Sequence, residues 1–358
     1  MRVLLIRLRL IGDVVLSTPV IRALRRTFPD ARLTYLVERD AAAVVAGNPH
    51  LNEVIVIERT RGIARLVSDL RLARRLRRER FDLVIDMHGG PRSSWLTLAT
   101  GAPRRIGYDV PGRRWMYTQT VTRARELRPR HSVLNQWDLL TAVPGWTGDL
   151  PDPAHDGVEM PLDRDADRRI AERLAAAEVA PDDELIVVHV SANNPFRRWS
   201  ESSFIQVVAG LASGAPRRRL VLSSGPSDHA AADRIAAGAR TLLGPAETAR
   251  VLDFGDVDLP ELRALIGRGR LFVGGDTGPL HVAATTATPV VAIYGPTLPA
   301  RSTPWRHPSF VTESVEIAGL PCRPCDQRVC APGDYRCLAR ITPGDVLTAA
   351  ERALRCAA

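Results

Sequence analysis

The chain contains the stretch Phe272-Val-Gly-Gly-Asp-Thr-Gly-Pro-Leu-His-Val-Ala-Ala284, followed by Tyr294-Gly-Pro-Thr297. It predicts a strand, a tight loop, a helix and a second strand. The short apolar run at 271–273 suits a buried parallel strand. The three glycines of the loop allow a sharp turn and the close approach of a ligand, and Pro279 suits a first helical position.

This loop is a candidate anion site. Either Asp276 or Thr277 is expected to cap the helix, whose free N–H groups then point into the loop. Open α/β sheets bind ligands at the carboxyl ends of their strands, where this loop lies. The pattern alone predicts a plain capped helix after a buried strand equally well.

Composition limits the possible partners. A chain of 358 residues predicts two domains, and its net charge of +9 favours acidic partners such as nucleic acid, anionic lipid headgroups or phosphorylated substrates. All 49 basic residues are arginine, so lysine chemistry is excluded. Basic stretches are not interleaved with aromatic residues, and nucleic acid is therefore not the expected partner.

The expected location is the cytoplasm. No apolar run approaches the length of a membrane span. The chain begins directly with the strand-like run 2–8, and nothing before it has the pattern of a signal peptide.

The first half alternates strands and helices. Strands are expected at 2–8, 33–37, 54–57 and 81–86, with helices at 14–27, 39–45 and 63–78, and the helix at 14–27 contains Pro19, which is expected to distort it. This alternation predicts a doubly wound parallel sheet.

Two turns of this half carry candidate residues. Gly12 and Asp13 occupy the first strand-to-helix turn, where Asp13 is either an N-cap or a carboxylate base. His88 follows the strand at 81–86 with two glycines beside it, and is either structural or on the acceptor side.

The segment 59–80 holds nine arginines against Asp69 and Glu79. Its helix is expected to bury a stripe made of Ile63, Val67, Leu70, Ala73 and Leu76. The arginines then form either a solvated helix face or a surface that docks on an anionic partner, such as a phosphorylated glycolipid at a membrane.

The composition changes at 147–167, which is rich in Pro and Asp and predicts an interdomain crossing. A second series follows, with strands expected at 185–190, 220–222, 251–253, 271–273 and 290–294. The simplest architecture is therefore two similar α/β units with a ligand at their junction.

Three motifs taken together resemble glycosyltransferase family 9, the heptosyltransferases of the bacterial lipopolysaccharide inner core. They are Gly12-Asp13, Arg197-Arg-Trp199 and Gly275-Asp-Thr-Gly-Pro-Leu-His281. The resemblance covers nearly the whole chain. It implies a GT-B fold, an α/β architecture of two Rossmann-like parallel-sheet domains facing a central cleft.

The resemblance also implies a division of labour. Residues 1–165 would form the acceptor-binding domain and 166–342 the nucleotide-sugar domain, while the last helix, in 343–358, would pack back on the first domain. The implied activity is inverting transfer of a heptose from ADP-heptose to a lipid A–Kdo or inner-core acceptor, with no cofactor required. The arginine-rich segment 59–80 adds the expectation of contact with the anionic inner face of the cytoplasmic membrane.

The resemblance assigns roles to matching residues. Asp13 is the expected base, with Gly12 and His88 on the acceptor side. The amides of Thr277 and Gly278 would meet the leaving diphosphate, Asp276 the sugar hydroxyls, and His281 would brace the loop or meet a phosphate. The remaining donor-side candidates are Ser191, Asn193, Arg197, Arg198 and Asp228.

Two of these assignments stay open. Many family members carry a lysine before the tryptophan of the second motif, and here Arg197 or Arg198 takes its place with a bidentate fork. Asp228 is the nearest acid for the nucleotide ribose, or a helix N-cap.

Three alternative functions stay open. The chain could use another nucleotide-sugar donor (hexose or N-acetylhexosamine), could be an epimerase of the same fold, or could be a non-catalytic basic binding protein.

Four of the five cysteines lie close together in the order Cys322-x2-Cys325-x4-Cys330-x6-Cys337. They either bind a structural zinc or iron, or are reduced or redox-paired thiols; the spacing fits no common zinc pattern. Stable disulfides are not expected in a cytosolic protein.

Overall fold

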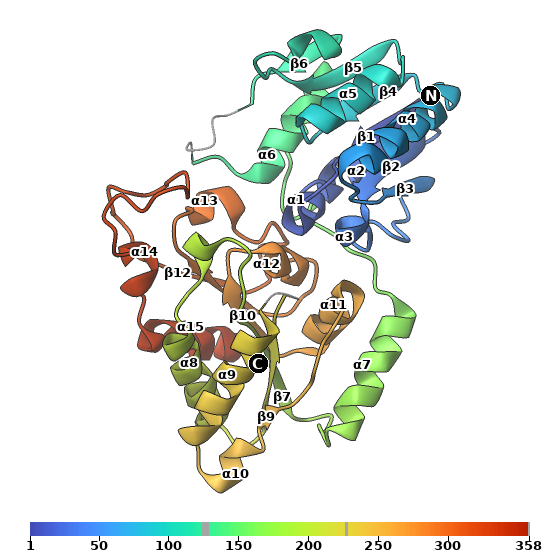
Figure 1. The fold of residues 1–358 in the computed structure, drawn as a ribbon. Helices are drawn as coiled ribbons and strands as arrows, with labels where there is room; N and C mark the ends of the chain where they lie inside the picture. Colours follow the sequence, from blue (N-terminus) through green and yellow to red (C-terminus); the bar gives the residue numbers. More distant parts are fainter. Residues whose placement is uncertain (124–128, 226–227, 357–358) are drawn as a thin grey trace. The chain divides into compact units, whose positions relative to one another are not determined.

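The computed structural model describes residues 1–123, 129–225 and 228–356, and the chain divides by its contacts into Met1–Pro161 and Leu162–Ala358 (Figure 1). Each unit is built on a six-stranded sheet in which all paired strands are parallel. The predicted doubly wound α/β fold is therefore confirmed. The finer domain boundaries given above stay predictions.

The N-terminal sheet has the order β3-β2-β1-β4-β5-β6. Its strands are β1 Arg2–Ile6, β2 Arg32–Glu38, β3 Glu53–Ile57, β4 Leu83–Asp86, β5 Arg104–Tyr108 and β6 Gln119–Val121. The central strand β1 is buried from Val3 to Ile6, as expected for an apolar strand covered on both faces. Because the strand order reverses between β1 and β4, the ligand-binding position of such a sheet lies at their carboxyl ends.

The three helices predicted in this unit are present, one of them as two shorter helices. The helices of this unit are α1 Ile11–Val15, α2 Thr18–Thr27, α3 Arg39–Ala42, α4 Gly62–Arg78, α5 Pro91–Ala99 and α6 Ser132–Trp137, with 3-10 turns η1 Arg114–Met116 and η2 Asp138–Ala142. Of these elements and the strands, α5, α6, β5 and β6 were not predicted. The single helix predicted at 14–27 is divided into α1 and α2. Pro19 lies in the first turn of α2, where its missing N–H is tolerated.

The predicted buried stripe of α4 is wrong in its first half. Ala73 and Leu76 are buried, but Ile63, Val67 and Leu70 are exposed. The helix buries Asp69, Leu72, Ala73 and Leu76, which lie three and four residues apart on one face. The apolar residues of the first two turns fall on a different face, so one continuous stripe does not exist.

The C-terminal sheet has the order β12-β11-β10-β7-β8-β9, which repeats the topology of the first sheet. Its strands are β7 Glu184–His189, β8 Arg218–Ser223, β9 Val251–Leu252, β10 Leu271–Gly275, β11 Val290–Tyr294 and β12 Thr312–Glu316. The order reverses between β7 and β10, so the loops after these two strands meet at the ligand-binding edge.

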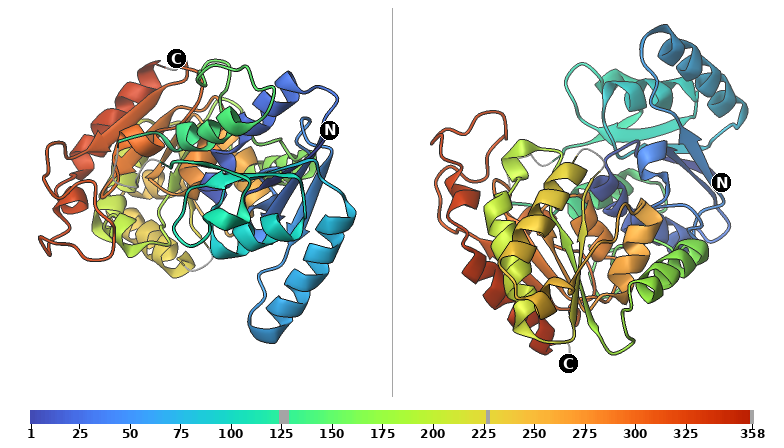
Figure 2. Two further views of the ribbon diagram at one scale, coloured as in Figure 1. Left: turned by 90° about the horizontal axis from the view of Figure 1, so that it is seen from above. Right: turned by 60° about the horizontal axis from the view of Figure 1, so that its bottom comes forward.

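Helices cover both sides of this sheet. They are α7 Arg164–Ala176, α8 Glu201–Gly214, α9 His229–Thr241, α10 Pro245–Thr248, α11 Leu259–Arg268, α12 Gly278–Ala283, α13 Pro299–Ser302, α14 Arg336–Ala339 and α15 Pro343–Cys356, with the 3-10 turn η3 Pro195–Arg197. In Figure 1, α8 and α15 lie on one side of the sheet and α7 and α11 on the other (see also Figure 2).

The last helix, α15, belongs to the core of the C-terminal unit. Val346, Ala349, Ala350 and Ala353 are fully buried there, and its charged side holds an ion pair between Glu351 and Arg218 at 2.6 Å. Its predicted packing on the other unit stays a prediction. Among the described residues, no helix is long and apolar enough to span a membrane.

Candidate functional site

The N-terminal candidate site is organised around Asp13. This residue is the third of α1, whose N-cap is Leu10, so the N-cap role considered for Asp13 is wrong. Its carboxylate forms an ion pair with Arg7. Arg7 is only 5% exposed, and its second amino group donates to the backbone carbonyl of Met87 at 2.6 Å. The Asp13 side chain keeps 34% of its surface accessible. A buried cation therefore fixes a carboxylate that solvent or a substrate can still reach.

His88 lies beside this pair. Burial lowers the pKa of His88 to about 4, and the positive charge of Arg7 acts in the same direction. The imidazole is therefore neutral near pH 7. Gly90 makes room for it, because a Cβ at that position would lie 2.8 Å from the His88 ring. The structure thus brings Gly12, Asp13 and His88 together at the carboxyl ends of β1 and β4.

The loop that carries His88 is held by Asp86, a residue that sequence reasoning missed. Its buried carboxylate accepts hydrogen bonds from the amides of His88 and Gly89, both at 2.9 Å. It also accepts from the hydroxyls of Ser93 at 2.9 Å and Tyr117 at 2.7 Å. Burial nevertheless raises the pKa of Asp86. The sequence did carry one indication of this role, because Asp86 is the last residue of β4, at the edge of the sheet where ligands bind.

The C-terminal candidate site is organised around Asp276, which follows β10 and is 2% exposed. One carboxylate oxygen, Oδ2, accepts a hydrogen bond from Thr297 and pairs with Arg197 at 3.2 Å. The other, Oδ1, is buried and accepts no hydrogen bond from any residue that the structure describes; it lies 3.9 Å from His281 Nε2. A buried carboxylate oxygen without a donor is an acceptor that a ligand hydroxyl can satisfy.

The two arginines of the second motif have different partners. Arg197 donates from Nε to Gln327 at 2.8 Å and from Nη1 to the Asp276 carbonyl at 2.9 Å. Arg198 donates from Nε to the Ala192 carbonyl at 2.7 Å and pairs with Asp228 at 3.1 Å. Arg197 is therefore the arginine attached to the Asp276 loop.

The loop after β7 contains the two secondary candidates. Ser191 accepts a hydrogen bond from the Gly225 amide at 2.8 Å and lies 3.3 Å from His189 Nε2. Asn193 is exposed. The neighbouring Asn194, which sequence reasoning did not select, accepts from the Phe196 amide at 3.0 Å and donates to Gln327 at 2.8 Å.

The helix after β10 begins as the glycine and proline pattern indicated. Thr277 occupies the N-cap position of α12, but its side chain makes no capping hydrogen bond and donates weakly to the Gly275 carbonyl at 3.4 Å. Gly278 opens the helix, and His281 is buried one turn later. No side chain caps the start of α12, so the backbone amides of this loop are the groups that a ligand would meet there.

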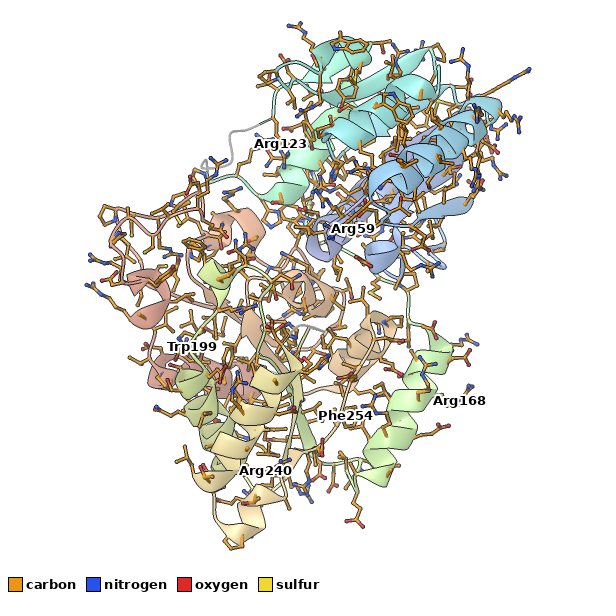
Figure 3. The ribbon with its side chains drawn as sticks, viewed as in Figure 1. Arg59, Arg123, Arg168, Trp199, Arg240 and Phe254 are labelled. Carbon is orange, nitrogen blue, oxygen red and sulfur yellow. The ribbon has the colours of Figure 1, made fainter. Side chains whose placement is uncertain are left out.

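A cavity of about 360 Å³ lies at the carboxyl ends of β8 and β9, a volume within the range of small-molecule sites. Arg240 and Phe254, which line it, are labelled in Figure 3. Asp228 occupies the N-cap position of α9, next to the lining residue His229, but its side chain makes no capping hydrogen bond. Its Oδ2 is buried and has no hydrogen-bond partner within the described ranges.

The cysteine-containing segment packs against the donor-side loops. Gln327 from this segment accepts from Arg197 and Asn194, Arg323 donates to the Thr297 carbonyl at 2.6 Å, and the ring of Tyr335 lies 5.5 Å from that of Phe196. All five cysteines are free. Over 1–123, 129–225 and 228–356, no group of three or more His, Cys, Asp or Glu side chains is arranged to hold a metal ion.

Comparison with known proteins gives a consistent result. Residues 69–335 match the model of glycosyltransferase family 9 (heptosyltransferase). Lipopolysaccharide heptosyltransferase 3 of Escherichia coli is 27% identical over 352 residues, which cover 97% of each chain.

Two solved structures share the fold. One is the family 9 glycosyl transferase from Veillonella parvula, with a TM-score of 0.80, 22% identity and coverage of 99% of this chain and 97% of that one. The other is E. coli ADP-heptose lps heptosyltransferase II, with a TM-score of 0.76, 20% identity and coverage of 99% of each chain.

Proposed function

The chain belongs to glycosyltransferase family 9, and from this membership we propose that it transfers a heptose from ADP-heptose to a lipid A–Kdo or inner-core lipopolysaccharide acceptor. The similarity to a lipopolysaccharide heptosyltransferase over nearly the full length of both chains supports this substrate class. The observation that carries the proposal is the Asp13 carboxylate, held by buried Arg7 at the carboxyl end of β1 and still accessible.

We assign Asp13 as the general base of an inverting transfer. The acceptor hydroxyl oxygen attacks the anomeric carbon, and its proton passes to the Asp13 carboxylate. The bond between that carbon and the diphosphate oxygen breaks, and ADP leaves with the electron pair. A positioned carboxylate of this kind contributes about 10²- to 10⁴-fold to the rate. His88, which is neutral, lies near enough to Asp13 to help orient the acceptor.

We assign donor binding to the C-terminal unit. The leaving diphosphate gains negative charge, which the amides of Thr277 and Gly278 would meet, and Arg197 supplies a permanent cation bonded to the carbonyl of the preceding residue, Asp276. The unsatisfied Oδ1 of Asp276 supports a hydrogen bond to a sugar hydroxyl. The cavity after β8 and β9 is the candidate site for the nucleotide base, with Arg198, Asp228 and Ser191 at its approach.

The cysteine cluster is kept as a prediction of a structural metal site. Thiolates are suitable ligands for zinc or iron. The described residues do not bring three or more such ligands together, so the geometry gives the site no support and no step of the reaction is assigned to it.

We also propose peripheral contact with an anionic membrane surface. The acceptor would be anchored in a membrane, and the net charge of +9 favours anionic lipid.

The test is a calorimetric panel of ADP-, UDP- and GDP-sugars, followed by a transfer assay. ADP-heptose should raise the melting temperature, because a ligand that binds only the folded protein stabilises it. The acceptor should then gain one heptose, as measured by mass spectrometry. Stabilisation by UDP-sugars alone would overturn the donor assignment, and donor turnover without an acceptor would indicate an epimerase.

A further inference from the structure

Helix α4 exposes a row of large apolar side chains. The exposed fractions are 82% for Ile63, 60% for Leu66, 39% for Val67 and 40% for Leu70. Their spacing of three, four and seven residues places them on one face of the helix. We call these four residues the apolar row. Contiguous exposed apolar surface of this kind marks an interaction site.

The apolar row is not the result of a loosely attached helix. The other face of α4 buries Leu72 and Leu76 in the core of the N-terminal unit. Asp69 on that face is also buried, and Arg92 pairs with it at 2.6 Å and with Glu38 at 2.9 Å. The helix is therefore anchored by one side, and the apolar row lies on a surface whose orientation within this unit is fixed.

Arginines continue the same face toward the end of the helix. Arg74 and Arg78 occupy positions that follow Leu70 at spacings of four and eight, and Arg71 lies beside them. All three are exposed. Figure 3 shows nitrogen-tipped side chains projecting from the outer side of α4. The face thus combines apolar side chains with long cationic ones, which is the composition of helices that lie in a membrane interface.

We propose that α4 docks the protein on an anionic phospholipid bilayer, with the apolar row inserted at the boundary between headgroups and acyl chains. The arginines then contact lipid phosphates, with their apolar stems along the surface. Charge complementarity selects this partner. A second copy of the same face would bring arginine against arginine, and nucleic acid would leave the apolar row in water.

The inference rests on the membrane contact proposed above and gives it a location. It is tested with the full-length protein and vesicles that contain no acceptor, so its outcome is separate from that of the transfer assay. Sedimentation should show binding to vesicles of phosphatidylglycerol and phosphatidylethanolamine that weakens with salt, and little binding to phosphatidylcholine vesicles.

Two variants test the surface. The quadruple variant I63S/L66S/V67S/L70S should bind the anionic vesicles more than about tenfold more weakly, because the inserted apolar area is lost. The triple variant R71S/R74S/R78S should also bind more weakly and lose most of the salt dependence. The control L150S/L242S removes exposed leucines elsewhere and should bind like the parent. All variants should keep the parent melting temperature.

Binding of the quadruple variant equal to that of the parent overturns the proposal. A parent protein that does not bind anionic vesicles also overturns it. If that parent forms dimers that the quadruple variant cannot form, as measured by analytical ultracentrifugation, a second copy of the chain occupies this surface instead. A parent that binds vesicles through α4 but transfers no sugar supports the docking surface and contradicts the proposed function. A quadruple variant that still transfers sugar to a deacylated, water-soluble acceptor but no longer binds vesicles supports both.

Discussion

Arg197 contacts Asp276 twice, once at its backbone carbonyl at 2.9 Å and once at its carboxylate at 3.2 Å. The loop after β7 and the loop after β10 are thereby joined by a single guanidinium. Because Asp276 is buried, its charge needs this partner. Arg197 therefore both neutralises a buried carboxylate and places a cation at the edge where the donor is proposed to bind.

Replacing Arg197 by Lys should weaken ADP binding about tenfold, because the charge remains but one ammonium nitrogen replaces Nε and Nη1, which bond Gln327 and Asp276. Isothermal titration calorimetry with ADP measures the effect. The matched control is R198K, since Arg198 reaches Asp228 instead and should have the smaller effect. A larger loss in R198K than in R197K would make Arg198 the diphosphate contact.

Gln327 should act as a positioning residue for Arg197. Its side-chain oxygen accepts from Arg197 and from Asn194, each at 2.8 Å. In Q327L both donors lose their acceptor, which costs about 1–2 kcal/mol, and the KM for the donor should rise with little change in kcat. Q327E keeps the acceptor oxygen and should restore the parent KM. Failure of Q327E to do so would leave Gln327 with a purely structural role.

The general architecture followed from the sequence because strand and helix patterns alternate regularly. Asp13 and His88 were predicted at the ends of two strands, and parallel strands bring their carboxyl ends to one edge. Neither inference needed long-range information, since each depended on a residue's place relative to its own strand.

Arg7 and Gln327 were missed because their roles depend on contacts between distant segments. Arg7 lies within an apolar run and looks like an ordinary strand residue, and Gln327 is 130 positions from Arg197 in the chain. In α4 two apolar sets share one helix, and periodicity cannot tell which of them meets the sheet. In the structure, Leu72 and Leu76 belong to the core cluster, whereas Ile63 is exposed.

Replacing Asp13 by Asn should lower kcat by about 10²- to 10⁴-fold, because the amide has the shape of the carboxylate but cannot take the proton. ADP affinity should be unchanged, since donor binding is assigned to the other unit. Asp30, an exposed carboxylate of the same unit, provides the control D30N, which should keep full activity. A D13N enzyme with the parent kcat would end the assignment of the base.

Metal analysis of the purified protein tests the cysteine prediction. A structural site should give about one zinc or iron per chain by inductively coupled plasma mass spectrometry, and C325S/C337S should lose it together with several degrees of melting temperature. The control C356S changes the exposed cysteine outside the cluster and should keep the metal. A metal-free parent protein with four titratable thiols in the cluster would exclude the site.

His189 should make the C-terminal unit sensitive to acid. The ring lies 3.0 Å from the Ser223 hydroxyl and 3.3 Å from that of Ser191, and burial lowers its pKa to about 4. The unfolded chain, with a histidine pKa near the ordinary value of about 6.5, binds this proton first as the pH falls. Neutral His189 therefore makes its full contribution to the free energy of unfolding above about pH 6.5, and this contribution is lost as the pH falls toward 4. Between pH 8 and pH 5 the free energy of unfolding should fall by about 2 kcal/mol more in the parent protein than in H189N. Urea unfolding of the full chain, followed through the transition of the C-terminal unit, measures this difference. Parallel pH profiles for the two proteins would show that His189 does not titrate with folding.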